Sequence, residues 1–490
     1  MNFRQSKMRP STAKAVALGA MILSAAGLAV LSSGPAQAAI LDVAKGGSCS
    51  NTTGNPYCTI SAAVANAVAG DTVVVAAGSY GERVAVTRSG TSGAPISIVT
   101  NVGAIVTGSS RAFDLSGSAW ITVRGFTITN TTLDGIRCVL CNNVSLIDNQ
   151  IKNALGKGIS ISNSSDMSLT DNTVEDSKFT GIDVIGSTRI DITGGFVTRS
   201  GQRLSGKVYK GIKYDSTTDS KIESVEVFDN SDTGIYLVNG ATGIRLKGVI
   251  VHHNARVFER IAAGIESRSS GNIVESSIAF ENEDSGINMR WGGGDGLMVN
   301  NVSYLNGDHG IDVLESPNPR IFSNSVYKNV TAGINVEGNS TNSMIMNNVS
   351  HDNGINSPRT EGDIRVTTSS VAGAVSNYNV VFSSVGGRIY HWNGTYYRKL
   401  TSLRSVNPAV EINGIQADPR WVDPVADDFH LQSGSPAIDS GNSGAIETSE
   451  GDQDAEGNSR CDHVFTANTG IGPRPYDDRG AYEYTTNCPG

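Results

Sequence analysis

A short phrase of one glycine, one isoleucine and one variable residue recurs along the middle of the chain. It occurs nine times, at Gly135-Ile-Arg, Gly158-Ile-Ser, Gly181-Ile-Asp, Gly211-Ile-Lys, Gly234-Ile-Tyr, Gly264-Ile-Glu, Gly286-Ile-Asn, Gly310-Ile-Asp and Gly333-Ile-Asn. The spacing is nearly constant, except for two longer intervals that precede Gly211 and Gly264. A period of about 23 residues with one short apolar strand per phrase is typical of stacked coils. The pattern therefore predicts an all-β solenoid, a parallel β-helix.

The variable position of the phrase should form a surface. Side chains alternate along a strand, so each coil buries its isoleucine and turns the next residue outward. Stacking then aligns these residues in one column, consisting of Arg137, Ser160, Asp183, Lys213, Tyr236, Glu266, Asn288, Asp312 and Asn335. Charged and aromatic residues gather in the middle of the column, and we expect the functional site there.

Both ends of the solenoid should be capped. Small apolar residues at helical spacing over residues 60–69 predict a short helix that closes the first coil. Asn-rich corners within the coils indicate tight turns, because Asn tolerates left-handed backbone angles. The repeat fades after about residue 375. We therefore divide the chain into residues 1–38, a β-helix domain over 39–375, and an irregular capping region over 376–490.

The first 38 residues look like a signal peptide. Four cationic residues precede an apolar run over residues 15–31, and Ala36-Gln-Ala38 resembles a cleavage site. A single membrane-spanning helix is the alternative. We expect a secreted protein that does not stay in the membrane after cleavage.

The charge balance argues against two classes of partner. The net charge is −9, and removal of the signal peptide takes away cations only. So acidic a protein is not expected to bind nucleic acid or anionic membranes in general.

Six cysteines in an exported chain suggest disulfides. Proximity in the sequence favours the pairs Cys49–Cys58, Cys138–Cys141 and Cys461–Cys488. A zinc site at Cys138 and Cys141 is the alternative.

The two longer intervals place extra residues at the same corner of the coil, over 200–208 and 255–262. Loops on a rigid scaffold commonly carry function. The cationic residues in and next to these insertions are Arg203, Lys207, Lys210, Arg256 and Arg260. A basic wall beside the variable column suits an anionic polymer.

The residue two positions after the variable one is also expected to face outward. This second column contains Asp215, Arg268, Arg290 and Glu337. Arg268 and Arg290 should lie about 5 Å apart at the backbone, and Glu266 on the same face could hold both. A purely structural ladder of ion pairs is the alternative.

Acidic residues collect at the corner that precedes the phrase, namely Asp232, Asp284 and Asp308, with His309 and Asp312 following. Carboxylates from adjacent coils are the hard oxygen ligands that calcium requires. Alternatively, each Asp simply caps the turn before a glycine. We expect a calcium site formed by Asp284, Asp308 and Asp312.

This set of residues suits β-elimination on a uronic-acid polymer. Removal of the proton next to the sugar carboxylate needs a cation on that carboxylate and a base nearby. Lysine or arginine can act as the base when other cations crowd it. Lys213, Arg268 and Arg290 are the candidates, and Tyr236 is available for a sugar face or the leaving oxygen.

The chain resembles the secreted β-helical polysaccharide lyases. The segments similar to that group are the opening Asp71-Thr-Val-Val-Val-Ala-Ala-Gly-Ser-Tyr80 and the terminal Ile438-Asp-Ser-Gly and Gly480-Ala-Tyr-Glu-Tyr. Asn306-Gly-Asp308-His-Gly-Ile-Asp312 is similar to the calcium phrase of the pectate lyases of family nine, with His309 where a second Asp is expected. The catalytic lysine of that family has Asn335 at its matching position. Met289-Arg290-Trp-Gly, and more loosely Glu266-Ser-Arg268, resemble segments of the alginate and chondroitin lyases of family six.

The resemblance implies a right-handed β-helix, calcium as the cofactor and an acidic polysaccharide as the substrate. We accordingly predict a polysaccharide lyase whose catalytic residues are Lys213, Glu266, Arg268 and Arg290. The residues predicted to bind substrate are Asp215, Tyr236, Asn288 and His309. The alternatives are a glycoside hydrolase that uses Asp215, Glu266 or Asp312 as acid and base, a uronate epimerase, and a non-catalytic carbohydrate-binding solenoid.

Overall fold

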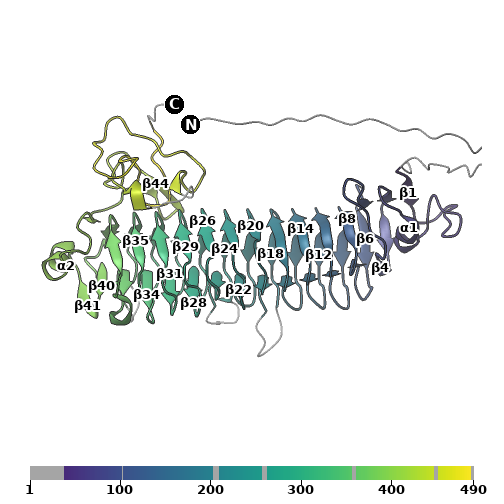
Figure 1. Ribbon diagram of the computed structural model, residues 1–490, viewed down its shortest axis with the longest axis horizontal. Helices are drawn as coiled ribbons and strands as arrows, with labels where there is room; N and C mark the ends of the chain where they lie inside the picture. The colour runs from purple at the N-terminus through teal and green to yellow at the C-terminus, as the bar shows by residue number, and fades with distance from the viewer. Residues whose placement is uncertain are drawn as a thin grey trace, which may run out of the picture. The chain divides into compact units, whose positions relative to one another are not determined.

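The computed structural model describes residues 38–101, 103–201, 209–256, 262–355, 360–445 and 451–486. The described residues belong to one compact unit that begins at Ala38. Their strands form three 14-stranded sheets, and each coil contributes in turn to each sheet (Figure 1). The predicted all-β solenoid is confirmed.

Sheet A begins next to the helix that caps the first coil. Its strands, in spatial order, are β1 (Ile40–Val43), β2 (Thr72–Val75), β5 (Ile96–Val99), β8 (Ala119–Arg124), β11 (Asn142–Ile147), β14 (Ser165–Thr170), β17 (Thr188–Thr193), β20 (Lys221–Glu223), β23 (Arg245–Lys247), β26 (Ile273–Glu275), β29 (Leu297–Val299), β32 (Arg320–Phe322), β35 (Met344–Met346) and β38 (Val375–Asn377).

Sheet B follows sheet A within each coil. Its strands are β3 (Gly78–Tyr80), β6 (Ala104–Thr107), β9 (Thr127–Thr129), β12 (Gln150–Lys152), β15 (Thr173–Glu175), β18 (Phe196–Thr198), β21 (Glu226–Phe228), β24 (Ile250–His252), β27 (Ile278–Phe280), β30 (Val302–Tyr304), β33 (Ser325–Tyr327), β36 (Val349–His351), β39 (Val380–Phe382) and β42 (Ile415–Gln416).

Sheet C carries the recurring phrase. Its strands are β4 (Val84–Ala85), β7 (Phe113–Asp114), β10 (Ile136–Val139), β13 (Ile159–Ser162), β16 (Ile182–Ile185), β19 (Ile212–Asp215), β22 (Ile235–Val238), β25 (Ile265–Ser267), β28 (Ile287–Arg290), β31 (His309–Leu314), β34 (Ala332–Glu337), β37 (Gly362–Val366), β40 (Tyr390–Trp392) and β41 (Thr395–Tyr397). Neighbouring strands pair in parallel, except that β40 and β41 are antiparallel.

The glycine of the phrase is required by close packing between coils. A Cβ atom on Gly234 would lie 2.7 Å from the carbonyl oxygen of Gly264 and 2.6 Å from a methyl group of Val251. The same close approach relates Gly264 to Gly286, at 2.8 Å. Only a residue without a side chain therefore fits where one coil crosses the next.

Two ladders of buried asparagines connect neighbouring coils by hydrogen bonds at their corners. In the longer ladder, each side-chain amide donates to the Oδ1 atom of the next asparagine at 2.9–3.1 Å along Asn230, Asn254, Asn282, Asn306, Asn329 and Asn353. The last amide donates to Asp363 at 3.1 Å. A second ladder runs through Asn301, Asn324, Asn348 and Asn379 and ends on Glu411. These asparagines therefore serve the architecture through hydrogen bonds between coils. The predicted left-handed angle falls instead on the residue before them, as at Asn300, Leu305 and Ser323.

The first coil is closed by helix α1 (Ile60–Asn66), which is shorter than the predicted 60–69. Thr59 caps its N-terminus by accepting a hydrogen bond from the backbone N–H of Ala62, and Ile60, Ala63 and Val64 are buried. The predicted disulfides Cys49–Cys58 and Cys138–Cys141 are both present. The second of these excludes the zinc alternative. Cys461 is disulfide-bonded, but its predicted partner Cys488 lies outside the described residues.

The C-terminal region adds helix α2 (Leu400–Val406), the antiparallel hairpin of β43 (Trp421–Asp423) and β44 (Asp428–Leu431), and two single-turn 3₁₀ helices, Thr368–Ser370 and Ser443–Ala445. No helix among the described residues is long and apolar enough to cross a membrane. The proposed signal peptide lies almost wholly outside those residues.

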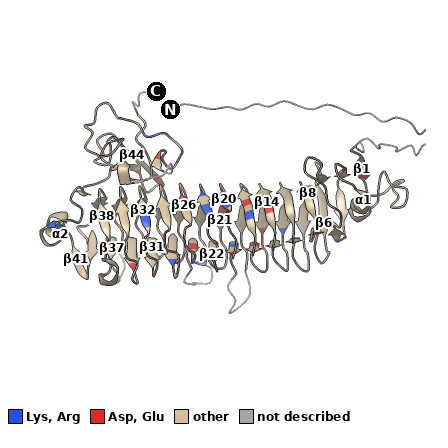
Figure 2. Cartoon of the chain, viewed as in Figure 1, with Lys and Arg blue, Asp and Glu red and all other residues tan. Residues whose placement is uncertain are grey.

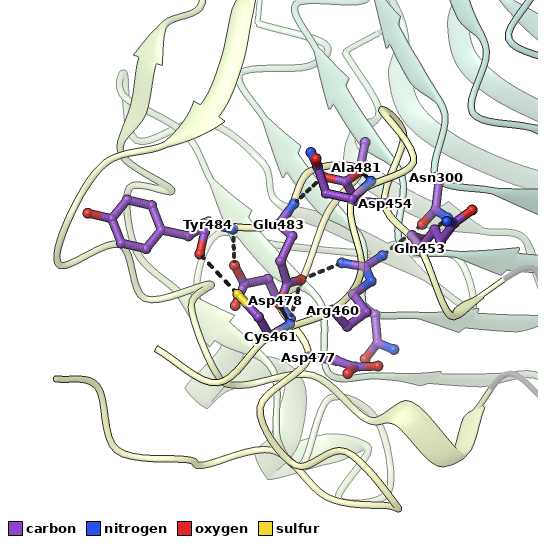
Figure 3. A network of polar contacts seen from close by, with 12 residues as sticks. Asn300, Gln453, Asp454, Arg460, Cys461, Asp477, Asp478, Ala481, Glu483 and Tyr484 are labelled. Atoms are coloured by element: carbon purple, nitrogen blue, oxygen red, sulfur yellow. Dashed lines mark hydrogen bonds and ion pairs between the residues drawn. The ribbon is translucent and has the colours of Figure 1, made fainter. Parts of the chain in front are cut away.

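A buried arginine ties the C-terminal region to the solenoid. Arg460 binds Glu483 at 2.8 Å and donates to the side chain of Asn300, next to β29, at 2.9 Å (Figure 3). Arg460 and Glu483 are almost completely buried. Glu483 thus holds Arg460 in place within the C-terminal region, and the hydrogen bond to Asn300 links that region to the solenoid.

Candidate functional site

The predicted column of variable residues exists on sheet C. Strand registers pair Arg137 with Ser160, and the same column continues through Asp183, Lys213, Tyr236, Glu266, Asn288, Asp312 and Asn335. It extends beyond the sequence prediction to Arg365 and His391. The period of the sequence therefore predicted the neighbours of each residue correctly.

A groove of about 510 Å³ lies over the middle of this column. It is lined by Lys157, Phe179, Thr180, Asp183, Tyr209, Lys210, Lys213, Asp232, Thr233, Tyr236, Glu266 and Arg268. Cationic, acidic and aromatic side chains thus face one space. Figure 2 shows that basic and acidic residues also lie close together on sheet A around β20, outside this groove.

Each acid that lines the groove has a cationic partner. Lys157 pairs with Asp183, and Lys210 pairs with Asp232. Arg268 binds Glu266 at 2.5 Å. A negatively charged ligand entering the groove would therefore meet cations that are already held in place.

Lys213 forms an ion pair with Asp215 at 2.8 Å. The sequence-based argument for Lys213 as a base assumed neighbouring cations, whereas the nearest charged group in the structure is an anion. Asp215 also accepts a hydrogen bond from Asn239. Burial raises the pKa of Asp215, but the hydrogen bonds, together with the charge of Lys213, outweigh it and lower the pKa below its ordinary value.

Glu266 holds the two arginines predicted to lie one above the other. The Nε atoms of Arg268 and Arg290 lie 2.5 Å and 3.7 Å from the same oxygen of Glu266. Both guanidinium groups also contact the exposed ring of Trp291, at 4.3 Å and 3.8 Å from its centre. Arg268 in addition lies 5.2 Å from the ring centre of Tyr236. The arginines are thus fixed between a carboxylate and aromatic rings.

Tyr236 lies at the centre of the groove. The ammonium group of Lys210 is 4.7 Å from its ring centre. Burial raises the pKa of Tyr236, although the charge of Arg268 opposes the shift. Its phenol therefore stays protonated near neutral pH and can donate a proton.

The carboxylate of Asp232 lies beside that of Glu266. Thr233 donates through its hydroxyl to Asp232 at 3.0 Å and lies 3.5 Å from Glu266. Both carboxylates are at least nine-tenths buried and line the groove. The sequence placed Asp232 only among the corner residues and did not associate it with Glu266.

The predicted calcium ligands lie close to one another in adjacent coils. Burial and the neighbouring carboxylate of Asp308 raise the pKa of Asp284 to about 7. Burial raises the pKa of Asp312 to about 8, although Asn335 donates a hydrogen bond to it at 2.6 Å. Crowded carboxylates of this kind are stabilised by a cation.

Asn288 lies beside the carboxylate of Asp312. Asn288 pairs in register with Asp312 and is buried, and neither atom of its side-chain amide has a hydrogen-bond partner among the described residues. An amide oxygen and three carboxylates are the ligand types that calcium prefers. Among the described residues, however, the acidic and histidine ligand atoms that all lie within 4.8 Å of one another belong to His309, Asp312 and Glu337, a set that shares only Asp312 with the predicted calcium ligands. A histidine in that set favours a transition metal instead.

Other site residues were not predicted or lie outside the described residues. Lys157, Thr233 and Trp291 were missed because none stands at the variable position of the phrase. Of the basic wall, Arg203, Lys207 and Arg260 are outside the described residues. Lys210 lines the groove, as expected, whereas Arg256 lies 3.8 Å from Glu281.

Comparison with family models supports the architecture. The model described as a right handed beta helix region matches residues 57–197, 134–301 and 257–401. These overlapping matches cover most of the coils, and their description agrees with the predicted handedness. No curated protein matches the sequence.

Solved structures with a similar fold share little sequence with this chain. The pectate lyase Pel9A is 16% identical, with a TM-score of 0.47 and coverage of 91% of this chain and 96% of that one. A structure of XylC with xylose is 13% identical, with a TM-score of 0.49 and coverages of 73% and 86%. The A-module of the mannuronan C-5 epimerase AlgE4 from Azotobacter vinelandii is 14% identical, with a TM-score of 0.43 and coverages of 66% and 86%. These similarities concern the fold alone.

Proposed function

Starting from the fact that the chain belongs to the right-handed β-helix family, we propose that it is a secreted polysaccharide lyase that cleaves a uronate-containing polymer by β-elimination. The observation that carries the proposal is that Arg268 and Arg290 share the single carboxylate of Glu266 beside the sheet C groove. One positive charge is therefore in excess there, which suits the carboxylate of a uronate chain and which a neutral sugar does not need.

The proposed reaction breaks two bonds and forms one double bond. A base removes the proton next to the sugar carboxylate, the glycosidic C–O bond breaks, and the departing oxygen receives a proton. Arg268 and Arg290 neutralise the carboxylate as negative charge develops on it. Tyr236 is the proposed proton donor, because it lines the groove and stays protonated. Lys213 is the proposed base, which requires its ammonium group first to pass a proton to Asp215, its partner at 2.8 Å.

Glu266 acts as a positioning residue in this proposal. It binds both arginines from a buried position, so it orients the two guanidinium groups before the substrate arrives. We further propose that calcium binds Asp284, Asp308 and Asp312, one or two coils beyond Glu266. When bound, it would supply further positive charge for a second uronate of the same chain. Asn288 and His309 would then contact sugar or complete the calcium ligands.

One observation favours a second function, glycoside hydrolysis. Asp232 and Glu266 are buried carboxylates that lie beside the same hydroxyl of Thr233 and face the groove. Paired carboxylates on either side of a glycosidic bond are the acid and base of such enzymes. This pair replaces the combination of Asp215, Glu266 and Asp312 expected from the sequence, since Asp215 pairs with Lys213 and Asp312 belongs to the acidic cluster.

The products distinguish the candidate functions. The purified protein is incubated with pectate, alginate and glycosaminoglycan, and both ultraviolet absorbance and reducing ends are followed. A lyase produces an unsaturated sugar end that absorbs in the ultraviolet. Reducing ends without absorbance would support hydrolysis instead, and an unchanged polymer would contradict both enzymatic proposals.

Replacement of Arg268 by alanine tests the site itself. Loss of a group that stabilises developing charge lowers turnover by about 10²-fold or more. Arg189→Ala is the matched control, because Arg189 forms an exposed ion pair with Asp166 on sheet A, away from the groove. Equal activity in the two variants would contradict the assignment of the site.

A further inference from the structure

The groove on sheet C crosses five adjacent coils. Its lining residues run from Lys157, which precedes β13, to Arg268, which follows β25. Neighbouring strands are about 4.8 Å apart, so the two ends are separated by about 19 Å along the solenoid. This length accommodates more than one sugar of the same chain. The two ends of the groove can therefore bind sugars of different kinds.

The two ends differ in charge among the described residues. Each of the three lysines that line the groove has a carboxylate of its own, in the pairs Lys157–Asp183, Lys210–Asp232 and Lys213–Asp215. At the other end the arginine pair, Arg268 and Arg290, shares the single carboxylate of Glu266. An anion is therefore attracted to the arginine pair, whereas the lysine end has no positive charge in excess.

Aromatic rings line the end where the charges are balanced. Phe179 and Tyr209 each stand two residues before the glycine of the recurring phrase, so they lie at the same corner of adjacent coils. Their ring centres are 4.9 Å apart, and the ring planes are tilted by 35°. Both side chains are partly exposed and face the groove. A ligand in the groove can therefore pack against them.

Tyr236 continues this aromatic surface towards the arginine pair. It stands on β22, one coil beyond Lys213 and one coil before Glu266. Its ring centre lies 5.2 Å from the guanidinium group of Arg268. The coil of Tyr209 is two coils, or about 10 Å, from that of Arg268. One chain lying along the groove therefore meets the arginine pair with one sugar and Phe179 and Tyr209 with another.

The two ends favour sugars of different chemistry. The carboxylate of a uronate forms charge-assisted hydrogen bonds with a guanidinium group. An uncharged sugar presents C–H groups on its faces, and an acetylated or deoxy sugar also presents a methyl group, all of which pack well on aromatic rings. A uronate at the lysine end would bring its carboxylate towards Asp183 and Asp232, without an excess cation to offset the repulsion.

We propose that the substrate is a mixed polysaccharide, in which a uronate that binds the arginine pair is joined to uncharged sugars that pack on Phe179 and Tyr209. The proposal rests on the proposed function, because it names the substrate of the same groove. Phe179 and Tyr209 are then residues that determine specificity, while the arginine pair serves the reaction. The preferred polymer is accordingly not one built of uronates only.

Four polymers test the proposal. In hyaluronan and in the backbone of rhamnogalacturonan, a uronate alternates with an uncharged sugar that carries a methyl group, whereas polygalacturonate and alginate contain uronates only. Cleavage is followed by ultraviolet absorbance, and binding is measured by calorimetry with Tyr236→Phe, which lacks the proposed proton donor. We expect kcat/KM on at least one mixed polymer to exceed that on either homopolymer at least about tenfold.

Variants of Phe179 test the aromatic contact. Phe179→Ala should raise KM for the mixed polymer about fivefold or more and leave kcat nearly unchanged. Phe179→Tyr keeps the ring and should restore the parent KM. Phe465→Ala is the matched control, because Phe465 is 81% exposed and lies outside the groove. A merely structural role of Phe179 would instead lower the melting temperature and kcat together.

The results separate this proposal from the proposed reaction. Equal or faster cleavage of the homopolymers overturns the proposal and leaves the lyase in place, and so does a Phe179→Ala variant that cleaves the mixed polymer as well as Phe465→Ala. If no polymer is cleaved but Phe179→Ala weakens the binding of a mixed polymer, the lyase is overturned and the choice of substrate is supported. Absence of both cleavage and binding overturns both.

Discussion

Glu266 and Asp312 occupy equivalent outward positions two coils apart, yet their environments differ. Glu266 is neutralised by Arg268 and Arg290, whereas acidic residues of neighbouring coils surround Asp312. In a stack of coils, the sequence at nearby positions on the next coil decides whether an acid meets a cation or another acid. That difference separates the groove from the proposed cation site.

The proposed calcium site predicts a binding measurement. Titration calorimetry of the metal-free protein should show binding of Ca²⁺, and Asp312→Asn should weaken it at least about tenfold, or by about 1.4 kcal/mol. Asp295→Asn is the control, because Asp295 is an exposed acid that lies outside the cluster. Binding of Zn²⁺ or Mn²⁺ but not Ca²⁺ would assign the cluster to His309, Asp312 and Glu337 instead.

Asp363 predicts a dependence of stability on pH. Burial raises its pKa well above the ordinary value, although Asn353 and Ser350 donate hydrogen bonds to it. The folded state therefore holds a proton that the unfolded state releases above about pH 4, so stability falls as the pH rises from that value. The loss approaches about 1.4 kcal/mol per pH unit for one proton.

Asp363→Asn removes this titration while keeping the shape of the side chain. Urea unfolding at a series of pH values should show a smaller decrease in stability for the variant than for the parent protein. Glu411, whose pKa burial also raises, remains as an internal reference. Equal slopes in parent and variant would show that Asp363 does not carry the effect.

At the scale of the element, one coil is specified by a glycine, an isoleucine and a corner asparagine. The isoleucine fills the interior, and the glycine permits the close crossing of coils. The asparagine satisfies backbone and side-chain groups of its neighbours that are buried away from water. No coil could make these contacts alone, because each one requires the next.

Asn306→Ala should therefore destabilise the fold. Its amide donates to Ala279, Ser303 and Asn329, and its Oδ1 atom accepts from Asn282. Truncation leaves several buried groups without partners, at a cost of about 1–3 kcal/mol for each. Asn318→Ala is the control, because Asn318 bonds Asp295 and Asn342 at an exposed position. Similar unfolding free energies for the two variants would contradict the role given to the ladder.

At the scale of the whole molecule, the C-terminal region depends on the solenoid. Its aromatic residues pack on Tyr304 and Tyr327, and Arg460 reaches Asn300. The region is thus a cover for the aromatic side of sheet B.

Arg460→Ala tests this attachment. It leaves Glu483 buried without its cation, which costs about 3–5 kcal/mol. We expect earlier proteolysis within residues 451–486 and a lower melting temperature. Arg189→Ala should change the melting temperature much less, because its ion pair with Asp166 on sheet A is exposed to solvent. If the two variants have the same melting temperature and the same rate of proteolysis, Arg460 does not hold the C-terminal region on the solenoid.

The sequence by itself determined the coil and the order of its outward residues. The phrase recurs once in each coil, so it aligns the variable positions regardless of how long the loops are. Neighbours in the column were therefore predicted correctly for Lys213, Tyr236, Glu266, Asn288 and Asp312. The same argument predicted that Arg268 and Arg290 would meet at Glu266. Backbone repetition carries this information, because hydrogen bonds between coils hold each strand in register with the next.

Only the tertiary structure decided which corner side chains complete the walls of the groove. Trp291, Thr233 and Lys157 stand at corners, where side-chain direction depends on the left-handed turns and on neighbouring coils rather than on strand alternation. The rings of Trp421 and His351 pack together, although the two residues are far apart in the sequence and no period relates them. Contacts of this kind follow from how the C-terminal region packs on sheet B, a packing that the repeat does not encode.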